Sequence, residues 1–592
     1  MSSSNPNSDL EAGSNQVRMT GAEVLVRMLI AYQVKYVFGV PGDTSLALYE
    51  ALHDQADRIR HVLARDERSA GFMADAYARL SHKPGVAECP SGAGALYSVP
   101  GVAEANASSI PVILFSSGIN LAGEGKGTIT ELDHHTLFES ITKWSSFVKL
   151  AGKLPETVRR AFRIACSGRP GAVHLTLPIE PVSAVLDWNP ADLWIEPECA
   201  AYPAYRTRGG PGDLDRIAGE LIRAERPVIV TGGGVNHSQA GAEIIDLAQR
   251  LEAPVVTTIS GQGVMPDDHY LALGVVGDNG FHPHANQAVE EADVLLYVGC
   301  KMGSVSTIKW TLPSPRPGRK IIQIDIDPVM LGNNYPNALS LAGDARLALE
   351  DLIGRLEAKA PGRRSRPWVE ALNQRRAAFW RRAEAVLKSG AVPLKPQRVV
   401  SALNRRLPSP SIVIADAGTP TPYITRFLKL GPGGSRFLIP RAYGGLGYAI
   451  PAVVGAWLAR PEARPVGLFG DGSLGMSAGE LETLVRLNVP AVLIHFNNGC
   501  FGWIKALQAL HCQGKFFSVD FNPGDMSRLA EALGLPARHV ETPEELEAGL
   551  DQALAASGPF FLDVVTEPEV KDLPPVYSWL KAAGLETDCG QE

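Results

Sequence analysis

Pro465-Val466-Gly467-Leu468-Phe469-Gly470-Asp471-Gly472-Ser473 is an apolar run that ends in a carboxylate between two glycines. A short apolar run of this kind predicts a strand buried on both faces, as in a parallel sheet covered by helices. Asp471 would then lie at the carboxyl end of that strand, where open parallel sheets bind their ligands. The flanking glycines, Gly470 and Gly472, let the backbone approach an anion closely. This stretch therefore predicts both an α/β fold and an anion site.

A second apolar run, residues 490–496, ends at Asn497-Asn498 and predicts a neighbouring strand whose end carries amide oxygens. A carboxylate from Asp471 and an amide oxygen from Asn498, with a loop carbonyl and diphosphate oxygens, would complete the octahedral oxygen shell that Mg²⁺ prefers. A Gly-Asp-Gly triplet alone is common in turns. Its combination with an Asn-Asn pair at a second strand end is what predicts a Mg²⁺–diphosphate site.

Strands alternating with helices recur along most of the chain, which predicts parallel sheets. The expected strands are residues 37–40, 85–89, 111–115, 227–231, 294–298, 320–325, 412–416, 465–469, 490–496 and 559–565. We expect an α/β protein of three doubly wound parallel-sheet domains, at 17–190, 205–355 and 396–570. A helical connector would span 356–395. The two ends, 1–16 and 571–592, are expected to be polar tails, the first of them disordered.

Composition limits the classes of partner. The chain has 592 residues, a formal net charge of −7 and a pI near 6.1, so neither nucleic acid nor an anionic membrane is an expected partner. We expect no membrane span, because no apolar run reaches the ~18 residues that one requires. The 7 cysteines lack Cys-x-x-Cys spacing. A reducing, cytoplasmic location is therefore the natural expectation.

The segment from Val454-Gly455 through Gly470–Ser473 to Asn497–Gly502 resembles the diphosphate motif of thiamine-diphosphate enzymes in the acetolactate synthase and pyruvate decarboxylase superfamily. Further similarity lies at Phe38–Asp43, Arg65–Arg79, Ser91–Gly94, Gly232–Gly234, Gly277–Gly280, Ile324–Pro328, Gly343-Asp344 and Tyr443–Pro451. The resemblance covers roughly residues 17–570. It implies that the three domains are, in chain order, a pyrimidine-binding, a central and a diphosphate-binding domain.

The resemblance implies thiamine diphosphate and Mg²⁺ as cofactors. The metal ligands would be Asp471, Asn498 and the carbonyl of Cys500. Gly444 would accept a hydrogen bond from the 4′-amino group of the cofactor, and Leu446 would hold its two rings in a V shape. The other residues expected to contact the cofactor are Gly418, Thr419, Gly470, Gly472, Ser473, Phe501 and Gly502.

Glu67 occupies the family's position for the carboxyl group that hydrogen-bonds N1′ of the pyrimidine, and it is both a catalytic and a cofactor-binding candidate. That bond favours the imino tautomer of the 4′-amino group, which removes the C2 proton of the thiazolium. Burial would raise the pKa of such a carboxyl group and suit it to the role. The alternative is a surface glutamate beside Arg65 and Arg68.

Three other residues are candidates for catalysis. Asp43, after Pro41-Gly42, and the pair His134-His135 resemble the proton-relay residues of pyruvate and indolepyruvate decarboxylases. An ungapped alignment, however, places that histidine pair near Gly127-Thr128, so the alternative is that His134 and His135 are loop or interface residues. The acidic residue that those decarboxylases carry after Asn-Asn is replaced by Trp503-Ile504-Lys505. This replacement favours ligation of the intermediate over its protonation.

The acetolactate synthase pattern is also incomplete. Its Phe-Gln-Glu segment is Ile129-Thr130-Glu131 here, its tryptophan after the metal loop is Leu507, and its flavin-contacting run is replaced by Lys301-Met302-Gly303-Ser304. The replaced run does not favour FAD, although FAD and a flavin oxidase stay open as alternatives. Phe501 and Trp503 either shape an apolar acceptor pocket or simply pack.

We expect a 2-keto acid lyase or carboligase, which decarboxylates a 2-keto acid and transfers the acyl-anion equivalent to a carbonyl acceptor. The alternatives are a non-oxidative decarboxylase that releases an aldehyde and a catalytically silent, cofactor-binding subunit. The resemblance also implies a homodimer or homotetramer. Each site would then combine the pyrimidine domain of one subunit with the diphosphate domain of another.

Overall fold

The computed structural model describes residues 16–357, 366–431 and 434–585. Its internal contacts divide the chain into two compact units. Unit 1 holds the residues up to Tyr205 together with Pro440–Pro461 and Ser477–Leu487, and unit 2 holds Arg206–Ile439, Glu462–Met476 and the residues from Asn488 onward. Two segments of the third predicted domain therefore pack with the first. One of them carries Gly444 and Leu446.

Unit 1 is built on a six-stranded parallel sheet with strand order β3-β2-β4-β5-β7-β6. Its strands are β2 (Tyr36–Gly39), β3 (Arg60–Leu63), β4 (Gly85–Cys89), β5 (Val112–Ser117), β6 (Trp144–Phe147) and β7 (Val173–Leu177). Every residue of β4, β5 and β7 is buried, as expected for strands covered on both faces. A separate antiparallel pair, which the sequence analysis did not predict, joins β1 (Val17–Thr20) to β8 (Val185–Trp188).

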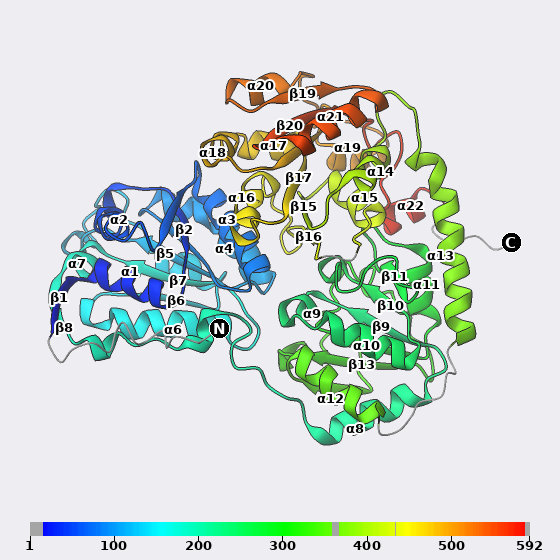
Figure 1. Cartoon of the computed structure of the whole chain (residues 1–592), viewed down its shortest axis with the longest axis horizontal. Helices are drawn as coiled ribbons and strands as arrows, with labels where there is room; N and C mark the ends of the chain where they lie inside the picture. Colours follow the sequence, from blue (N-terminus) through cyan, green and yellow to red (C-terminus); the bar gives the residue numbers. More distant parts are fainter. Residues whose placement is uncertain (1–15, 358–365, 432–433, 586–592) are drawn as a thin grey trace. The chain divides into compact units, whose positions relative to one another are not determined.

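Helices cover both faces of this sheet (Figure 1). α1 (Gly21–Ala31) and α6 (Leu154–Cys166) pack on one face, where Tyr32 stacks on Phe162 with ring centroids 3.8 Å apart. α3 (Glu67–Ser81) and α4 (Ala93–Ala107) pack on the other. The other helices of unit 1 are η1 (Asp43–Ser45), α2 (Leu46–His53), η2 (Leu121–Gly123), α5 (His134–Glu139), η3 (Ala151–Lys153), α7 (Ile179–Ser183), η4 (Pro190–Leu193), η5 (Pro197–Ala200), α16 (Ala449–Ala459) and α18 (Glu480–Leu487).

Glycines let three helices of unit 1 pack closely. α16 crosses α3 where a Cβ on Gly455 would lie 2.1 Å from the carbonyl oxygen of Met73. α3 meets α4 where a Cβ on Gly71 would lie 2.8 Å from Cα of Gly101. A side chain at either position would collide with rigid backbone, so these contacts require glycine. These contacts hold α3, α4 and α16 together. Glu67 is the first residue of α3, and Gly444 and Leu446 lie just before α16.

The first sheet of unit 2 also has six parallel strands, in the order β11-β10-β9-β12-β13-β14. The strands are β9 (Pro227–Thr231), β10 (Val255–Thr257), β11 (Ala272–Val275), β12 (Val294–Val298), β13 (Lys320–Asp325) and β14 (Leu339–Ala342). The helices associated with this sheet are α8 (Pro211–Arg223), α9 (Gly233–Ser238), α10 (Gly241–Leu251), η6 (Ile259–Gly261), α11 (Pro283–Glu291), η7 (Pro328–Met330), α12 (Ala345–Glu357) and α13 (Arg366–Leu387). α8, α10 and α12 pack together on one face.

The second sheet of unit 2 is parallel too, with strand order β16-β15-β17-β18-β20-β19. Its strands are β15 (Ser411–Ala415), β16 (Arg436–Leu438), β17 (Arg464–Gly470), β18 (Val492–Asn497), β19 (Ala537–Val540) and β20 (Phe560–Val565). Its helices are α14 (Pro396–Arg406), α15 (Pro420–Phe427), α17 (Asp471–Ser477), α19 (Gly502–His511), α20 (Ser527–Ala532), α21 (Pro543–Ala555) and α22 (Tyr577–Ala582).

Three six-stranded parallel sheets confirm the predicted α/β class. β4, β9, β12 and β13 coincide with expected strands residue for residue. The expected connector 356–395 contains α13, and the expected tail 571–592 contains α22, whose Trp579 packs against Trp503 with ring centroids 4.3 Å apart. Residues 1–15, within the tail expected to be disordered, lie outside the described residues. Within the described ranges, no helix is both long and apolar enough to cross a membrane.

Candidate functional site

Two strand ends in the second sheet of unit 2 bring Asp471 and Asn498 together. β17 ends at Gly470, and Asp471 begins α17 directly after it, while the neighbouring strand β18 ends at Asn497. The backbone N–H of Asn498 donates to Oδ2 of Asp471 at 3.1 Å. Both residues are half-buried. Because parallel strands end at the same edge of a sheet, residues that are distant in sequence meet here.

A buried carboxylate, Glu569, fixes the orientation of the Asn498 side chain. Nδ2 of Asn498 donates to Oε2 of Glu569 at 3.1 Å, and its Oδ1 accepts from the N–H of Cys500 at 3.3 Å. Glu569 is 1% exposed, and burial raises the pKa of its carboxyl group. A Cβ on Gly502 would lie 1.9 Å from Oε2 of Glu569, so the Glu569 side chain packs directly against the backbone of this glycine. The sequence analysis missed Glu569, which lies in a polar segment without a recognisable motif.

The oxygen donors at this edge fit a Mg²⁺ ion. Asp471 offers a carboxylate, Asn498 an amide oxygen and Cys500 a main-chain carbonyl, and these are hard donors of the kind that Mg²⁺ takes. Burial raises the pKa of the Cys500 thiol to about 12. The sulfur therefore stays protonated near neutral pH and does not compete as a ligand. The donor set is that of Mg²⁺ rather than of zinc.

The remaining cofactor candidates of unit 2 lie around the same sheet edge. Gly418 follows β15 in a left-handed conformation with φ of 95°, and a Cβ there would meet nothing within 4 Å. Oγ1 of Thr419 would lie 3.8 Å from a Cβ on Gly470. Phe501 packs edge-on against Phe521 with ring centroids 4.7 Å apart. The ends of β15 and β17 thus carry Gly418, Thr419, Gly470, Gly472 and Ser473.

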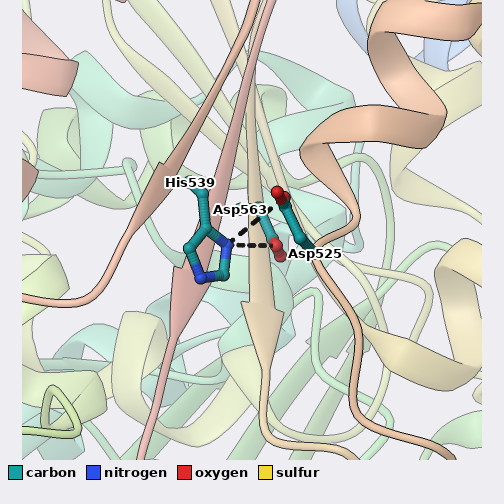
Figure 2. A group of neighbouring side chains, drawn as sticks. All are labelled: Asp525, His539 and Asp563. Carbon is teal, nitrogen blue, oxygen red and sulfur yellow. Dashed lines mark hydrogen bonds and ion pairs between the residues drawn. The ribbon is translucent and has the colours of Figure 1, made fainter.

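A chain of carboxylates and imidazoles lies beside Asp471 in the same sheet. Asp563 on β20 is in register with His495 on β18 and with His539 on β19, and it accepts from Nδ1 of each at 2.8 Å. Nε2 of His495 lies 3.5 Å from Oδ1 of Asp471. At the other end, Nδ1 of His539 lies 3.4 Å from Oδ1 of Asp525 (Figure 2). The chain therefore runs from the candidate metal ligand to a half-exposed histidine.

These contacts set the charges of the chain. Burial alone would lower the pKa of His495, but the carboxylate groups of Asp471 and Asp563 raise it. Burial opposes a low pKa at Asp563, and His495 and His539 nevertheless hold it below its usual value. The pKa of His539 is raised by Asp563 against the effect of partial burial. Sequence analysis did not predict this chain, because only strand register places its members on one face.

Glu67, the first residue of α3, is the candidate acid of unit 1. It is half-buried, and burial raises the pKa of its carboxyl group. A Cβ on Gly94 would lie 3.0 Å from Oε1 of Glu67, so α4 approaches this carboxyl group through a glycine. The flanking arginines pair with other carboxylates, Arg65 with one on α18 at 3.7 Å and Arg68 with Asp66 at 3.3 Å.

A second buried carboxylate, Glu104 on α4, anchors the loop that carries Gly444 and Leu446. It accepts from the N–H groups of Ala442 at 3.1 Å and of Tyr443 at 2.9 Å. Glu104 is 2% exposed. Gly444 adopts φ of 69°, and Leu446 is half-buried. The sequence analysis predicted the loop but missed Glu104, because nothing local links α4 to a segment more than three hundred residues later.

Asp43 precedes Thr44, whose hydroxyl belongs to a group of hydrogen-bonded hydroxyls. It is exposed and begins η1, and the hydroxyl of the next residue, Thr44, donates to Oγ of Ser91 at 3.2 Å. Ser91 also contacts Oγ1 of Thr130 at 2.7 Å. Thr130 has φ of 64°, which is unusual for a β-branched residue. Thr130, which stands where the acetolactate synthase pattern has Gln, therefore contacts the turn at Ser91.

The two histidine candidates occupy different environments. His134, the first residue of α5, is 1% exposed, and burial lowers its pKa to about 4. Its Nδ1 lies 2.8 Å from Oγ of Ser116. His135 is half-buried, with Nδ1 3.1 Å from Oγ of Ser145. His134 is therefore a neutral, interior residue, unlike an exposed loop histidine.

Comparison with protein-family models gives three matches that follow one another along the chain. Residues 19–137 match the model described as thiamine pyrophosphate enzyme, N-terminal TPP binding domain. Residues 214–352 match the central domain of thiamine pyrophosphate enzymes, and residues 416–564 match their C-terminal TPP binding domain. Each match contains one of the three parallel sheets or most of it.

Curated relatives resemble the chain over nearly its whole length. It is 34% identical to a probable acetolactate synthase large subunit of Methanocaldococcus jannaschii, with 93% of this chain and 92% of the relative aligned. It is 32% identical to the acetolactate synthase isozyme 3 large subunit of Escherichia coli, with 90% and 92% aligned. It is 33% identical to a probable 2-ketoarginine decarboxylase of Pseudomonas aeruginosa, with 92% and 93% aligned.

Proposed function

This chain belongs to the family of thiamine pyrophosphate enzymes, and we propose that it decarboxylates a 2-keto acid and transfers the acyl-anion equivalent to a carbonyl acceptor. Ligation is supported by the residues at the start of α19. Trp503 packs against Trp579 there, and Lys505 pairs with Asp520 at 2.5 Å. Residues 503–505 include no carboxylic acid to protonate the intermediate. An intermediate that is protonated slowly has time to meet a carbonyl acceptor.

In this proposal the residues of unit 1 act on the pyrimidine ring. Glu67 keeps a proton on its carboxyl oxygen and hydrogen-bonds N1′, a role that the raised pKa of a half-buried carboxyl group suits. The carbonyl of Gly444 orients the 4′-amino group, and Leu446 holds the two rings apart. Asp43, the residue before Thr44, is assigned a role in proton transfer to or from the substrate.

The residues of unit 2 hold the diphosphate. Asp471, Asn498 and the Cys500 carbonyl bind Mg²⁺, and Gly418, Thr419, Gly470, Gly472, Ser473, Phe501 and Gly502 contact the cofactor. Once bound, thiamine diphosphate supplies the carbon that adds to the keto group and takes up the electron pair when CO₂ leaves. We further propose a homodimer or homotetramer in which Glu67 and Asp471 of one site come from different subunits.

The second candidate is a decarboxylase that releases an aldehyde. The specific observation in its favour is that the probable 2-ketoarginine decarboxylase is as similar to this chain as the acetolactate synthases are. Under this alternative, the proton for the intermediate would come from a residue outside 503–505. His135, which is half-buried, and the exposed Asp43 are the candidates.

Product analysis separates the two candidates. The protein, supplied with thiamine diphosphate and Mg²⁺, is given single 2-keto acids of differing side chain, each alone and with an added aldehyde. We expect CO₂ together with a hydroxyketone or a 2-hydroxy-3-keto acid product. Free aldehyde in an amount equal to the CO₂, with no ligation product, would instead identify a decarboxylase.

Glu67→Gln is the control for this experiment. It should reduce both CO₂ release and exchange of the C2 proton by about 10²–10⁴-fold, because an amide cannot act as an acid at N1′. Binding of Mg²⁺ and of the diphosphate should change little. Undiminished C2 exchange in Glu67→Gln would exclude the assigned role of Glu67.

A further inference from the structure

Three histidines and two serines form one hydrogen-bonded chain inside unit 1, and all of them except His135 are buried. Nδ1 of His134 lies 2.8 Å from Oγ of Ser116, and Oγ of Ser116 lies 2.7 Å from Nε2 of His174. Nδ1 of His174 lies 2.9 Å from Oγ of Ser145, which lies 3.1 Å from Nδ1 of His135. His174 is completely buried, and Ser116 is as well.

Strand register explains why these residues meet. His174 on β7 is the register partner of Ser145 on β6 and of Leu114 on β5. Ser116 stands two residues beyond Leu114, and residues two apart along a strand share a face. α5 then places His134 above that face. The chain thus crosses three adjacent strands and ends on a helix.

The hydrogen bonds from Gly92 through His134, Ser116 and His174 to Ser145 each have a defined donor and acceptor. The backbone N–H of Gly92 can only donate, and it donates to Nε2 of His134 at 3.4 Å. Burial keeps the pKa of both His134 and His174 below the ordinary value, so each ring is neutral at neutral pH and carries one proton. His134 must therefore carry its proton on Nδ1 and donate to Ser116. Ser116 then donates to His174, and His174 donates through Nδ1 to Ser145.

The turn that His134 holds lies against Glu67. Gly92 has φ of 62° and packs so closely on Thr130 that a Cβ on Gly92 would lie 2.8 Å from Cβ of Thr130. Oγ1 of Thr130 also forms a hydrogen bond with Oγ of Ser91 at 2.7 Å. Two residues further on, Gly94 is the point at which α4 approaches the carboxyl group of Glu67. Thr130 and His134 therefore both contact the turn from Ser91 to Gly94, and this turn packs against Glu67.

We propose that His134 is a positioning residue, held as its Nδ1–H tautomer by the chain through Ser116 and His174, and that it fixes the Ser91–Gly94 turn against Glu67. This assignment differs from a role in proton relay, because Nε2 of His134 is occupied by the Gly92 N–H and Nδ1 by Ser116. The tautomer follows from the hydrogen bonds alone. The effect on catalysis rests on the proposed function, since it acts through Glu67.

The tautomer is tested on the full-length protein labelled with ¹⁵N-histidine. Long-range ¹H–¹⁵N spectra should show His134 and His174 neutral, with the proton on Nδ1, over about pH 5.5–8. The two signals are assigned by their disappearance in His134→Gln and His174→Gln. A His134 signal that titrates near the ordinary histidine pKa, or that shows the Nε2–H tautomer, would overturn the proposal whatever reaction the protein catalyses.

The positioning effect is tested with a matched pair of amides. Gln places an amide oxygen near the position of Nε2, so His134→Gln can still accept from Gly92, whereas the shorter Asn reaches only the position of Nδ1. C2-proton exchange in the cofactor-loaded protein should fall about 10–100-fold in His134→Asn and in Ser116→Ala, and stay within about threefold of wild type in His134→Gln. The pH profile of exchange should keep its shape in all three variants.

Two controls make the outcomes distinguishable. Ser146→Ala removes a hydroxyl from the adjacent residue of β6, which points to the opposite face, and should leave exchange unchanged. Equal losses in His134→Gln and His134→Asn, or loss of an ionisation from the pH profile in His134→Gln, would show an acid–base role and refute positioning. If Glu67→Gln itself leaves exchange unchanged, the proposed function fails, while the tautomer result still decides the structural inference.

Discussion

Asn498 donates its backbone N–H to Oδ2 of Asp471 at 3.1 Å, which ties together the ends of two adjacent parallel strands. The bond occupies one carboxylate oxygen of Asp471 and leaves the other facing Nε2 of His495 at 3.5 Å. The candidate metal ligands are thus positioned by the sheet before any ion binds. Preorganisation of this kind reduces the entropy that binding must overcome.

Replacing Asp471 should abolish the response of the protein to Mg²⁺. In Asp471→Asn the site loses its only anionic ligand among the three assigned donors, so thiamine diphosphate with Mg²⁺ should no longer raise the melting temperature. A ligand at about 100 times its Kd stabilises a wild-type protein by roughly 2.7 kcal/mol. Differential scanning fluorimetry with and without both cofactors measures this difference.

Glu531→Gln, which removes an exposed carboxylate on α20, serves as the control. It should retain the full stabilisation by Mg²⁺ and thiamine diphosphate. An Asp471→Asn protein that is stabilised as strongly as wild type would rule out Asp471 as a metal ligand.

Glu569 should support metal binding through Asn498. Glu569→Ala leaves Nδ2 of Asn498 without its acceptor and frees the side chain to rotate, so the affinity for Mg²⁺ should fall about 10–100-fold. Glu569→Gln keeps an acceptor oxygen at the same distance and should lose much less. Titration of the diphosphate-loaded protein with Mg²⁺, followed by intrinsic tryptophan fluorescence, compares the two variants. Equal affinities in both would mean that the contact does not orient Asn498.

Complementation tests whether a site is shared between subunits. Glu67→Gln and Asp471→Asn should each be inactive alone. Mixed after dissociation and reassociation, they should recover about a quarter of wild-type activity, because half of the dimers are mixed and each mixed dimer has one intact site. Recovery at the level of the separate variants would place Glu67 and Asp471 of one site on the same chain.

Gly455→Ala should destabilise unit 1. The added Cβ would lie 2.1 Å from the carbonyl oxygen of Met73, and rigid backbone on α3 cannot move aside. The cost should be about 1–3 kcal/mol or more. Gly354→Ala is the matched control: it is also a helical glycine, but a Cβ there meets nothing within 4 Å. That substitution should raise stability by up to about 1 kcal/mol, through higher helix propensity. Thermal unfolding measures both.

The ion pair between His539 and Asp563 should make stability depend on pH. The pKa of His539 is raised in the folded state, so its contribution is complete below about pH 6.5, the unfolded value, and is lost as pH rises through the folded pKa. His539→Asn keeps a hydrogen-bond donor but cannot titrate. The stability difference between wild type and His539→Asn should therefore shrink as pH rises above about 6.5, and it should stay below about 1 kcal/mol because the ring is partly exposed. A constant difference would contradict the assigned ion pair.

The strands of this protein were largely predictable from local sequence. Runs such as Pro227–Thr231 and Val294–Val298 are predominantly apolar and are followed by glycine, so their position follows from burial on both faces. The pair β1–β8 was not predictable. Its strands are four residues each, one of them mostly exposed, and they lie far apart in the chain. Pairing between such strands depends on the tertiary fold rather than on local pattern.

The sequence alone was enough to predict the fold class, the family and the residues expected to contact the cofactor or the metal. Asp471, Asn498 and Glu67 lie at strand ends or helix starts, and the short motifs around them identify them in the sequence. Tertiary structure alone decided which groups support them: Glu569 behind Asn498, Glu104 behind the Gly444 loop, and the chain from His174 to His134. These contacts depend on strand register and helix packing between distant segments. A buried polar side chain meets its partner only when the whole sheet is assembled, so no local pattern records the pairing.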